Sequence, residues 1–153
     1  MFKHILIPTD GSALANESAE AGVQLAKALG ARVTGFFAAP PATPLVYSHF
    51  LPVGYMPPEE HAALIEKAAQ QHLAVIEKAA KAAGVPFELT HETNDYPADA
   101  IVETARKKGC DAIFIASHGH HGRRGPLLGS ITRKVLGSAP MPVDVYRNES
   151  VTR

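Results

Sequence analysis

Short apolar runs alternate with helical patterns along the whole chain, and this alternation constrains the fold more than any other feature. Residues 4–8 and 112–116 are continuous apolar runs, of the kind found in strands buried on both faces. Between such runs, apolar residues recur at the three- and four-residue spacing of an amphipathic helix. Strands that alternate with helices predict right-handed crossovers and a parallel sheet covered on both faces.

Glycine, proline and charged residues set the expected boundaries of these elements. Strands are expected at residues 4–8, 32–38, 87–90, 112–116 and 143–146. Helices are expected at residues 18–29, 59–83, 97–108 and 130–137. Residues 39–58 hold six of the 12 prolines and no apolar period, which predicts an irregular loop, and residues 148–153 are expected to form a tail.

Length and composition narrow the class of protein. A chain of 153 residues fits one domain, here residues 1–153. Its apolar runs are shorter than ten residues and its single cysteine cannot form an internal disulfide, so we expect a cytoplasmic protein without a membrane span. Fifteen Lys plus Arg balance 15 Asp plus Glu, which argues against a general nucleic-acid binder.

A glycine-rich segment, residues 116–130 (ASHGHHGRRGPLLGS), follows the fourth strand. Ligands of open parallel sheets bind at the carboxyl ends of the strands. The glycines expose backbone N–H groups, and a helix that starts at Ser130 adds unpaired N–H groups and a positive dipole end. The pattern favours a phosphate site over a plain surface loop. It is not a Walker or dinucleotide loop, since neither signature occurs.

These residues resemble the universal stress protein family. Its nucleotide-binding members carry glycine, two residues, glycine, nine residues, glycine, and then serine or threonine, and Gly119, Gly129 and Ser130 match the last three positions. Ala116 stands where the family motif begins with glycine and is the one departure. The resemblance also covers residues 5–12, 110–119 and 142–143, and so nearly the whole chain.

The family resemblance implies a fold, a ligand and a partner. The implied fold is a Rossmann-like single α/β domain, with five parallel strands in the order 3-2-1-4-5 and helices on both faces. The implied function is a stress-response regulatory module that binds ATP, or AMP or ADP, with Mg²⁺ as a candidate ion. A homodimer through the edge strand Val143 to Tyr146 is also implied, and the client protein stays unidentified.

The nucleotide-site residues are carried over from the family by position. Asp10 is expected to accept hydrogen bonds from the ribose, as a carboxylate after the first strand commonly does, although an ordinary turn or N-cap role is the alternative. The main chain of Ala38 is expected to meet adenine, and the glycine motif to hold the phosphates. The full set is Pro8, Thr9, Asp10, Ala38, Ile115, Ala116, His118, Gly119, Gly122, Gly129, Ser130 and Ile131.

Two other functions stay open. In the first, Ala116 disables the site and the chain is a nucleotide-independent dimeric interaction protein. In the second, the loop histidines His118, His120 and His121 serve a metal-dependent or nucleotidyl-transfer enzyme, although the loop holds no carboxylate or cysteine to complete a metal site. The sequence offers no convincing general base, so we expect no catalytic residue and at most slow ATP hydrolysis.

Two residues outside the glycine segment also raise the question of chemistry. His72 lies on the apolar stripe of the second helical pattern, so we expect a core or interface histidine and not a ligand. Cys110 sits between a glycine and an apolar strand, so we expect a small buried residue and not a reactive thiol.

Overall fold

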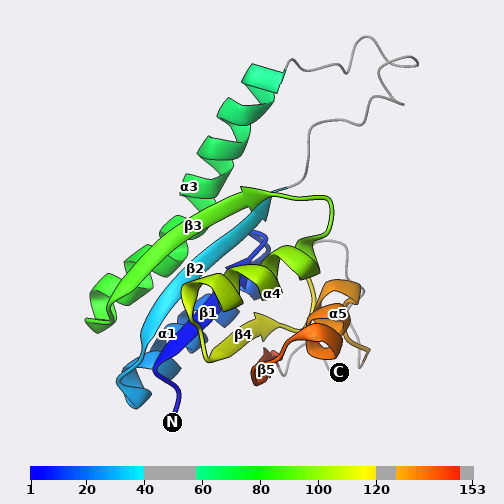
Figure 1. The fold of residues 1–153 in the computed structure, drawn as a ribbon. Coiled ribbons are helices and arrows are strands. Elements are labelled where there is room, and N and C mark those ends of the chain that lie inside the picture. The colour runs from blue at the N-terminus through cyan, green and yellow to red at the C-terminus, as the bar shows by residue number, and fades with distance from the viewer. Residues whose placement is uncertain (40–57, 120–126, 149–153) are drawn as a thin grey trace.

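Five parallel strands form one sheet in the computed structural model, which describes residues 1–39, 58–119 and 127–148 (Figure 1). The strands are β1 (His4–Thr9), β2 (Arg32–Ala39), β3 (Phe87–Thr93), β4 (Ala112–Ala116) and β5 (Val143–Tyr146). Their spatial order is β3-β2-β1-β4-β5, and every neighbouring pair is parallel. The predicted α/β fold and strand order are confirmed.

Helices cover both faces of this sheet (Figure 1). They are α1 (Ala13–Leu29), α3 (Pro58–Ala83), α4 (Pro97–Lys108) and α5 (Ser130–Ser138). Successive side chains of a strand point to opposite faces, so Ile5 and Ile7 pack towards α1 and α3, while Leu6 packs towards α4 and α5. The result is two apolar layers that share β1, all six residues of which are buried.

Strand β1 occupies the middle of the sheet. It pairs with β2 over its full length, from His4 opposite Arg32 to Thr9 opposite Phe37. It pairs with β4 on its other side, where Ile5 lies opposite Ala112. The chain runs from β1 to β2 on one side of β1, through α1, and returns to β4 on the other side, through α4. The carboxyl end of β1 is therefore the point where the strand order reverses.

The sequence-based boundaries differ from the structure by more than one residue at two elements. Helix α1 begins at Ala13 and not at residue 18, because the Ser12 hydroxyl caps it by accepting a hydrogen bond from the Ala15 N–H at 3.2 Å. Strand β3 continues to Thr93 and not to residue 90, because it pairs with β2 as far as Ala39. The predicted loop and tail lie outside the described residues, apart from Ala39, Pro58 and Asn148.

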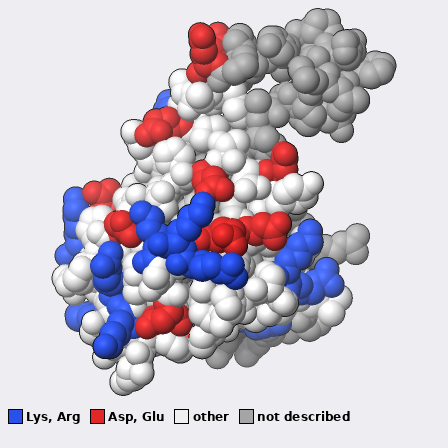
Figure 2. Space-filling view, in the orientation of Figure 1, with Lys and Arg blue, Asp and Glu red and all other residues white. Residues whose placement is uncertain are grey.

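Charged side chains of both signs are interspersed on the face that carries α4 (Figure 2). One ion pair there joins Arg106 to Glu103 at 3.4 Å, and another joins Lys108 to Glu88 at 3.5 Å. Within the described part of the chain, no helix is long and apolar enough to cross a membrane.

A partly buried polar chain lies at the amino end of the sheet, away from the glycine segment. The Thr34 hydroxyl donates to Glu88 Oε1 at 3.1 Å, so it accepts the hydrogen bond from His4 Nε2 at 2.6 Å. Burial, followed by the positive charge of Arg32, lowers the pKa of His4. Cys110 is buried, as expected, and burial raises the pKa of its thiol to about 11, which disfavours the reactive thiolate.

The lowered pKa of His4 predicts a pH dependence of stability. Below the ordinary histidine pKa of about 6.5, His4 binds a proton in the unfolded chain but not yet in the folded chain, and this favours unfolding. The contribution of His4 to the free energy of unfolding is therefore fully present above this pH and decreases below it. Urea unfolding should show that the free energy of unfolding falls more between pH 7 and pH 5 in the wild type than in His4→Gln. This variant keeps a hydrogen-bond donor and loses the titrating group. Equal losses would contradict this assignment.

Candidate functional site

A cavity of about 620 Å³ opens at the carboxyl ends of β1, β2 and β4. Nine of the twelve residues predicted for the site line it: Pro8, Thr9, Asp10, Ala38, Ile115, Ala116, His118, Gly119 and Ile131. Gly129 and Ser130 directly precede Ile131 at the start of α5, and Gly122 lies outside the described residues. The structure therefore gathers residues from four distant segments around one cavity.

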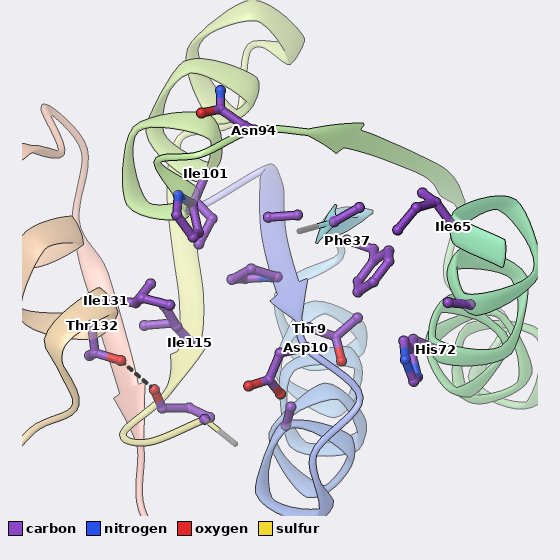
Figure 3. A pocket seen from close by; sticks show the side chains of 18 of the residues that line it. Thr9, Asp10, Phe37, Ile65, His72, Asn94, Ile101, Ile115, Ile131 and Thr132 are labelled. Carbon is purple, nitrogen blue, oxygen red and sulfur yellow. Dashed lines mark hydrogen bonds between the residues drawn. The ribbon is translucent and has the colours of Figure 1, made fainter. Parts of the chain in front are cut away.

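Figure 3 shows how the side chains surround this space. Thr9 and Asp10 lie between two walls, formed on one side by Ile115, Ile131 and Thr132 and on the other by Phe37, Ile65 and His72. Asn94 and Ile101 close the end nearest α4. The wall formed by β2 and α3 is largely apolar. The opposite wall ends at the glycine segment, where Asp10, His118 and Gly119 border the polar part of the cavity.

The turn after β1 fixes the Asp10 carboxylate. Its Oδ1 accepts a hydrogen bond from the Ser12 N–H at 2.9 Å, while the Thr9 hydroxyl oxygen accepts one from the Gly11 N–H at 3.1 Å. Gly11 has a φ of 82°, and the His72 ring occupies the space that a Cβ would need there. Asp10 is therefore a turn residue as well as a cavity residue, and the N-cap of α1 is Ser12.

Hydrogen bonds within the chain hold the two described ends of the glycine segment together. The Gly129 N–H donates to the Ser117 carbonyl oxygen at 2.8 Å, and the Thr132 hydroxyl donates to the Ala116 carbonyl oxygen at 2.8 Å. Ala116, at the position where the family motif has glycine, is only 7% exposed. The Ala116 methyl thus joins the cavity wall while its carbonyl stabilises α5.

The His118 ring belongs to the same set of contacts. Its Nε2 bonds the Leu127 carbonyl oxygen, which can only accept, so Nε2 carries the hydrogen. Its Nδ1 then accepts from the Ser117 hydroxyl at 3.0 Å. Both nitrogens are used within the loop, so in this arrangement His118 does not offer a metal ligand.

Metal chemistry at the loop histidines finds no further support in the described structure. Within residues 1–39, 58–119 and 127–148, no group of three or more His, Cys, Asp or Glu side chains could hold a metal ion. His120 and His121 lie outside these ranges.

The start of α5 is arranged to receive an anion. Its N-cap is Gly129, which supplies no side-chain hydrogen bond to the helix. The N–H groups of a first helical turn have no partner within their own helix, and they lie at its positive end. Ser130 adds an exposed hydroxyl at the same point. Helix starts of this kind bind phosphates and carboxylates.

Sequence reasoning missed the contribution of α3. Four cavity residues on it follow helical spacing, His61, Ile65, Ala68 and His72, whereas the sequence predicted only a core or interface role for His72. The His72 ring packs edge-on against Phe37, with 5.1 Å between ring centroids. The two histidines on this otherwise apolar stripe could have indicated that the helix lines a site.

Two cavity residues that follow β3, Asn94 and Asp95, were also missed. They are polar turn residues placed directly after a strand. Because parallel strands end at one edge of the sheet, this position could have indicated a place in the site.

Comparison with known proteins decides the family. The universal stress protein family model matches residues 1–147. The chain belongs to the universal stress protein family. A universal stress protein of Methanocaldococcus jannaschii is 30% identical over 151 residues, covering 96% of this chain and 83% of the relative. A universal stress protein structure from Burkholderia pseudomallei has a TM-score of 0.74 at 20% identity, covering 95% of this chain and 96% of that one.

Some universal stress proteins of this fold bind adenine nucleotides. The Archaeoglobus fulgidus protein was solved in complex with dAMP, with a TM-score of 0.62, 19% identity and coverage of 96% of this chain and 98% of that one. An Arabidopsis thaliana member was solved with AMP bound, with a TM-score of 0.64, 15% identity and coverage of 99% and 95%. At these identities the likeness to this chain concerns the fold.

The contact between Asp10 and Gly119 yields a prediction about this universal stress protein. A Cβ at Gly119 would overlap Asp10 Oδ2, so Gly119→Ala must displace the carboxylate, and we expect it to cost about 1 kcal/mol of stability. In an Asp10→Ala background the same change should lower the free energy of unfolding only slightly. Urea unfolding of the wild type, the two single variants and the double variant measures this. Additive costs would contradict the contact.

Proposed function

We propose that this universal stress protein binds an adenine nucleotide in the cavity and acts as a stress-response regulatory module whose state depends on that occupancy. One observation carries the proposal. The carboxylate of Asp10 and the uncapped start of α5 border the same cavity, at the point where the strand order reverses. A carboxylate at this position suits ribose hydroxyls, and a helix start suits phosphate.

The rest of the cavity suits an adenosine in one orientation. In the proposed complex, adenine lies in the apolar part near Phe37 and Ile65 and meets the main chain of Ala38. The ribose reaches Asp10, beside Pro8 and Thr9, while the backbone of Gly119 and Gly129 and the first turn of α5 approach the phosphate. Three further predicted residues that line the cavity, Ile115, Ala116 and His118, lie beside the ribose and the phosphate in this arrangement.

ATP, ADP and AMP share the adenosine and first phosphate that these residues would contact. Mg²⁺ would accompany the longer phosphate chains. The proposal assigns no catalytic residue. It includes a cytoplasmic location, with which the free, buried thiol of Cys110 is consistent.

A matched pair of glycine variants tests the nucleotide site. A Cβ at Gly129, the N-cap of α5, would lie 3.2 Å from the Ser117 carbonyl oxygen, whereas nothing lies within 4 Å of a Cβ at Gly137 near the end of α5. We expect Gly129→Val to weaken binding of AMP by about tenfold or more, as measured by titration calorimetry, and Gly137→Val to leave it unchanged. Circular dichroism of both variants checks that they fold.

The native ligand can be sought directly by denaturing the purified wild type and identifying released small molecules by mass spectrometry. The proposal expects adenine nucleotides among them. No released nucleotide, together with no heat on titration of AMP, ADP or ATP into the wild type, would overturn it. The outcome would then favour the nucleotide-independent interaction protein.

We also propose a homodimer through β5. The Pro142 carbonyl oxygen accepts from the Ile113 N–H of β4, and the Tyr146 carbonyl oxygen accepts from the Ser117 N–H directly after β4. Alternation along the strand therefore turns the N–H groups of Val143 and Val145 away from β4, towards the edge of the sheet. An edge of this kind is a place for a second copy to pair.

Oligomeric state in solution tests this pairing. We expect light scattering to give twice the chain mass for the wild type, and a monomer for Val145→Pro, which removes an outward N–H while leaving the bonds to β4 in place. Unfolding curves of the variant verify its stability. A wild-type monomer at micromolar concentration would rule out the proposed dimer.

A further inference from the structure

Strand β3 forms the border of the sheet opposite β5 (Figure 1). It pairs with β2 along all seven of its residues, from Phe87 opposite Val33 to Thr93 opposite Ala39. Its other side pairs with no strand in the part of the chain that the structure describes. Six residues of β3 are half-buried and Thr93 is exposed, whereas β1 is buried throughout. An edge of this length can pair with another extended chain.

Hydrogen bonds at the two ends of β3 show which of its backbone groups face outward. The Pro86 carbonyl oxygen accepts from the Val33 N–H of β2 at 2.9 Å, and the Asn94 N–H donates to the Ala39 carbonyl oxygen of β2 at 3.2 Å. The N–H and C=O groups of one strand residue point to the same side, and successive residues alternate. The even-numbered residues of β3 therefore bond to β2. The outward-facing residues are Phe87, Leu89, His91 and Thr93.

The side chains of β3 give this edge two different faces. Phe87 and Leu89 pack against the apolar layer formed with α1 and α3. Glu88, Thr90 and Glu92 alternate with them along the strand and so point to the opposite face. A strand added at this edge would meet apolar side chains on one face and polar, acidic side chains on the other.

The two carboxylates of the polar face differ in their surroundings. Glu88 lies 3.7 Å from Arg32 and 3.5 Å from Lys108. Glu92 accepts a hydrogen bond from the Asn94 side chain at 3.1 Å, and among the described residues no Lys or Arg lies within ion-pair distance of it. Residues 40–57, which connect β2 to α3, contain no Lys or Arg. A partner that places a cation opposite Glu92 would supply the missing positive charge.

A second copy of this chain does not offer that cation. Two copies of β3 would pair antiparallel about a two-fold axis, and the register that pairs all four outward-facing residues has its axis at Thr90. This register places Glu88 of one copy opposite Glu92 of the other. Like charges at directly opposite positions destabilise a pair of strands. The edge therefore suits a strand of a different sequence.

We propose that the β3 edge binds an extended segment of a partner protein as an additional strand of the sheet. The segment carries Lys or Arg opposite Glu92 and small apolar residues on the face that holds Phe87 and Leu89. Main-chain hydrogen bonds to the outward-facing residues provide affinity, and the alternation of side chains provides specificity. Because β5 forms the other border of the sheet, binding at β3 leaves the proposed homodimer intact.

Fluorescence anisotropy of labelled peptides with the full chain tests the proposal. The first peptide has the length of β3, with Val at every second position and Lys, Thr and Lys between, so that a Lys lies opposite Glu92 in either orientation. The matched peptide has Glu in place of both Lys. We expect the basic peptide to bind at least about tenfold more tightly than the acidic one. No binding of the basic peptide, or equal binding of the two, would overturn the proposal.

Three variants test where the peptide binds. His91→Pro removes an outward N–H and leaves the bonds to β2 in place, so it should weaken the basic peptide by at least about tenfold. Val145→Pro, the matched change at the β5 edge, should leave the affinity unchanged. Glu92→Lys should reverse the preference between the two peptides, and this result decides the proposal if unfolding curves show that His91→Pro does not fold. A preference unchanged by Glu92→Lys would contradict the role of this carboxylate.

Amide hydrogen exchange, followed by NMR on the labelled full chain, provides the structural signature of strand addition. The bound basic peptide should slow exchange at the four odd-numbered residues of β3, whose N–H groups point outward. Exchange at the even-numbered residues, which already bond to β2, should change little. Protection that appears only in other elements would place the peptide elsewhere and overturn the proposal.

Discussion

The parallel pairing of β1 with both β2 and β4 is the constraint on which the rest of the structure depends. It buries all six residues of β1 and forces the chain to leave the sheet at one edge, where the turn after β1 and the glycine segment after β4 come together. The cavity follows from this pairing, because none of the four helices that the structure describes fills the space where the strand order reverses. The topology of the sheet thus sets the position of the cavity, and the side chains around it then determine which ligand it can hold.

The described ends of the glycine segment are organised by their own contacts. Ser117, His118 and Thr132 form hydrogen bonds within the loop and with the start of α5, which tie the first turn of α5 to the end of β4 beside the cavity. In the proposed function, the nucleotide places its phosphate at a site that is already in place. A preorganised site of this kind loses less entropy on binding than one that must form around its ligand.

Much of the fold could be predicted from the sequence, because apolar periodicity and glycine or proline stops report directly on strands and helices. One boundary was wrong because a single side-chain contact decides it, the Ser12 cap that starts α1 early, and another because pairing with β2 extends β3 to Thr93. The place of the glycine segment and Asp10 at the cavity could be predicted from the ends of the strands and from the motif spacing. The face of α3 could not, since a stripe such as Ile65, Ala68 and His72 looks the same whether it faces a core or a cavity. Nor could spacing show that the His118 ring bonds to its own loop.

A nitrogen-15 NMR titration of the labelled full chain with AMP tests the central claim most directly. The account predicts that the amide signals of Ser130, Ile131 and Gly119 shift most, together with those of Ala38 and Asp10, because these groups surround the cavity where β1, β2 and β4 end. Signals at the opposite end of the sheet, such as those of His4 and Cys110, should stay in place. Saturating AMP that moves no signal, or moves only signals remote from this cavity, would contradict the account.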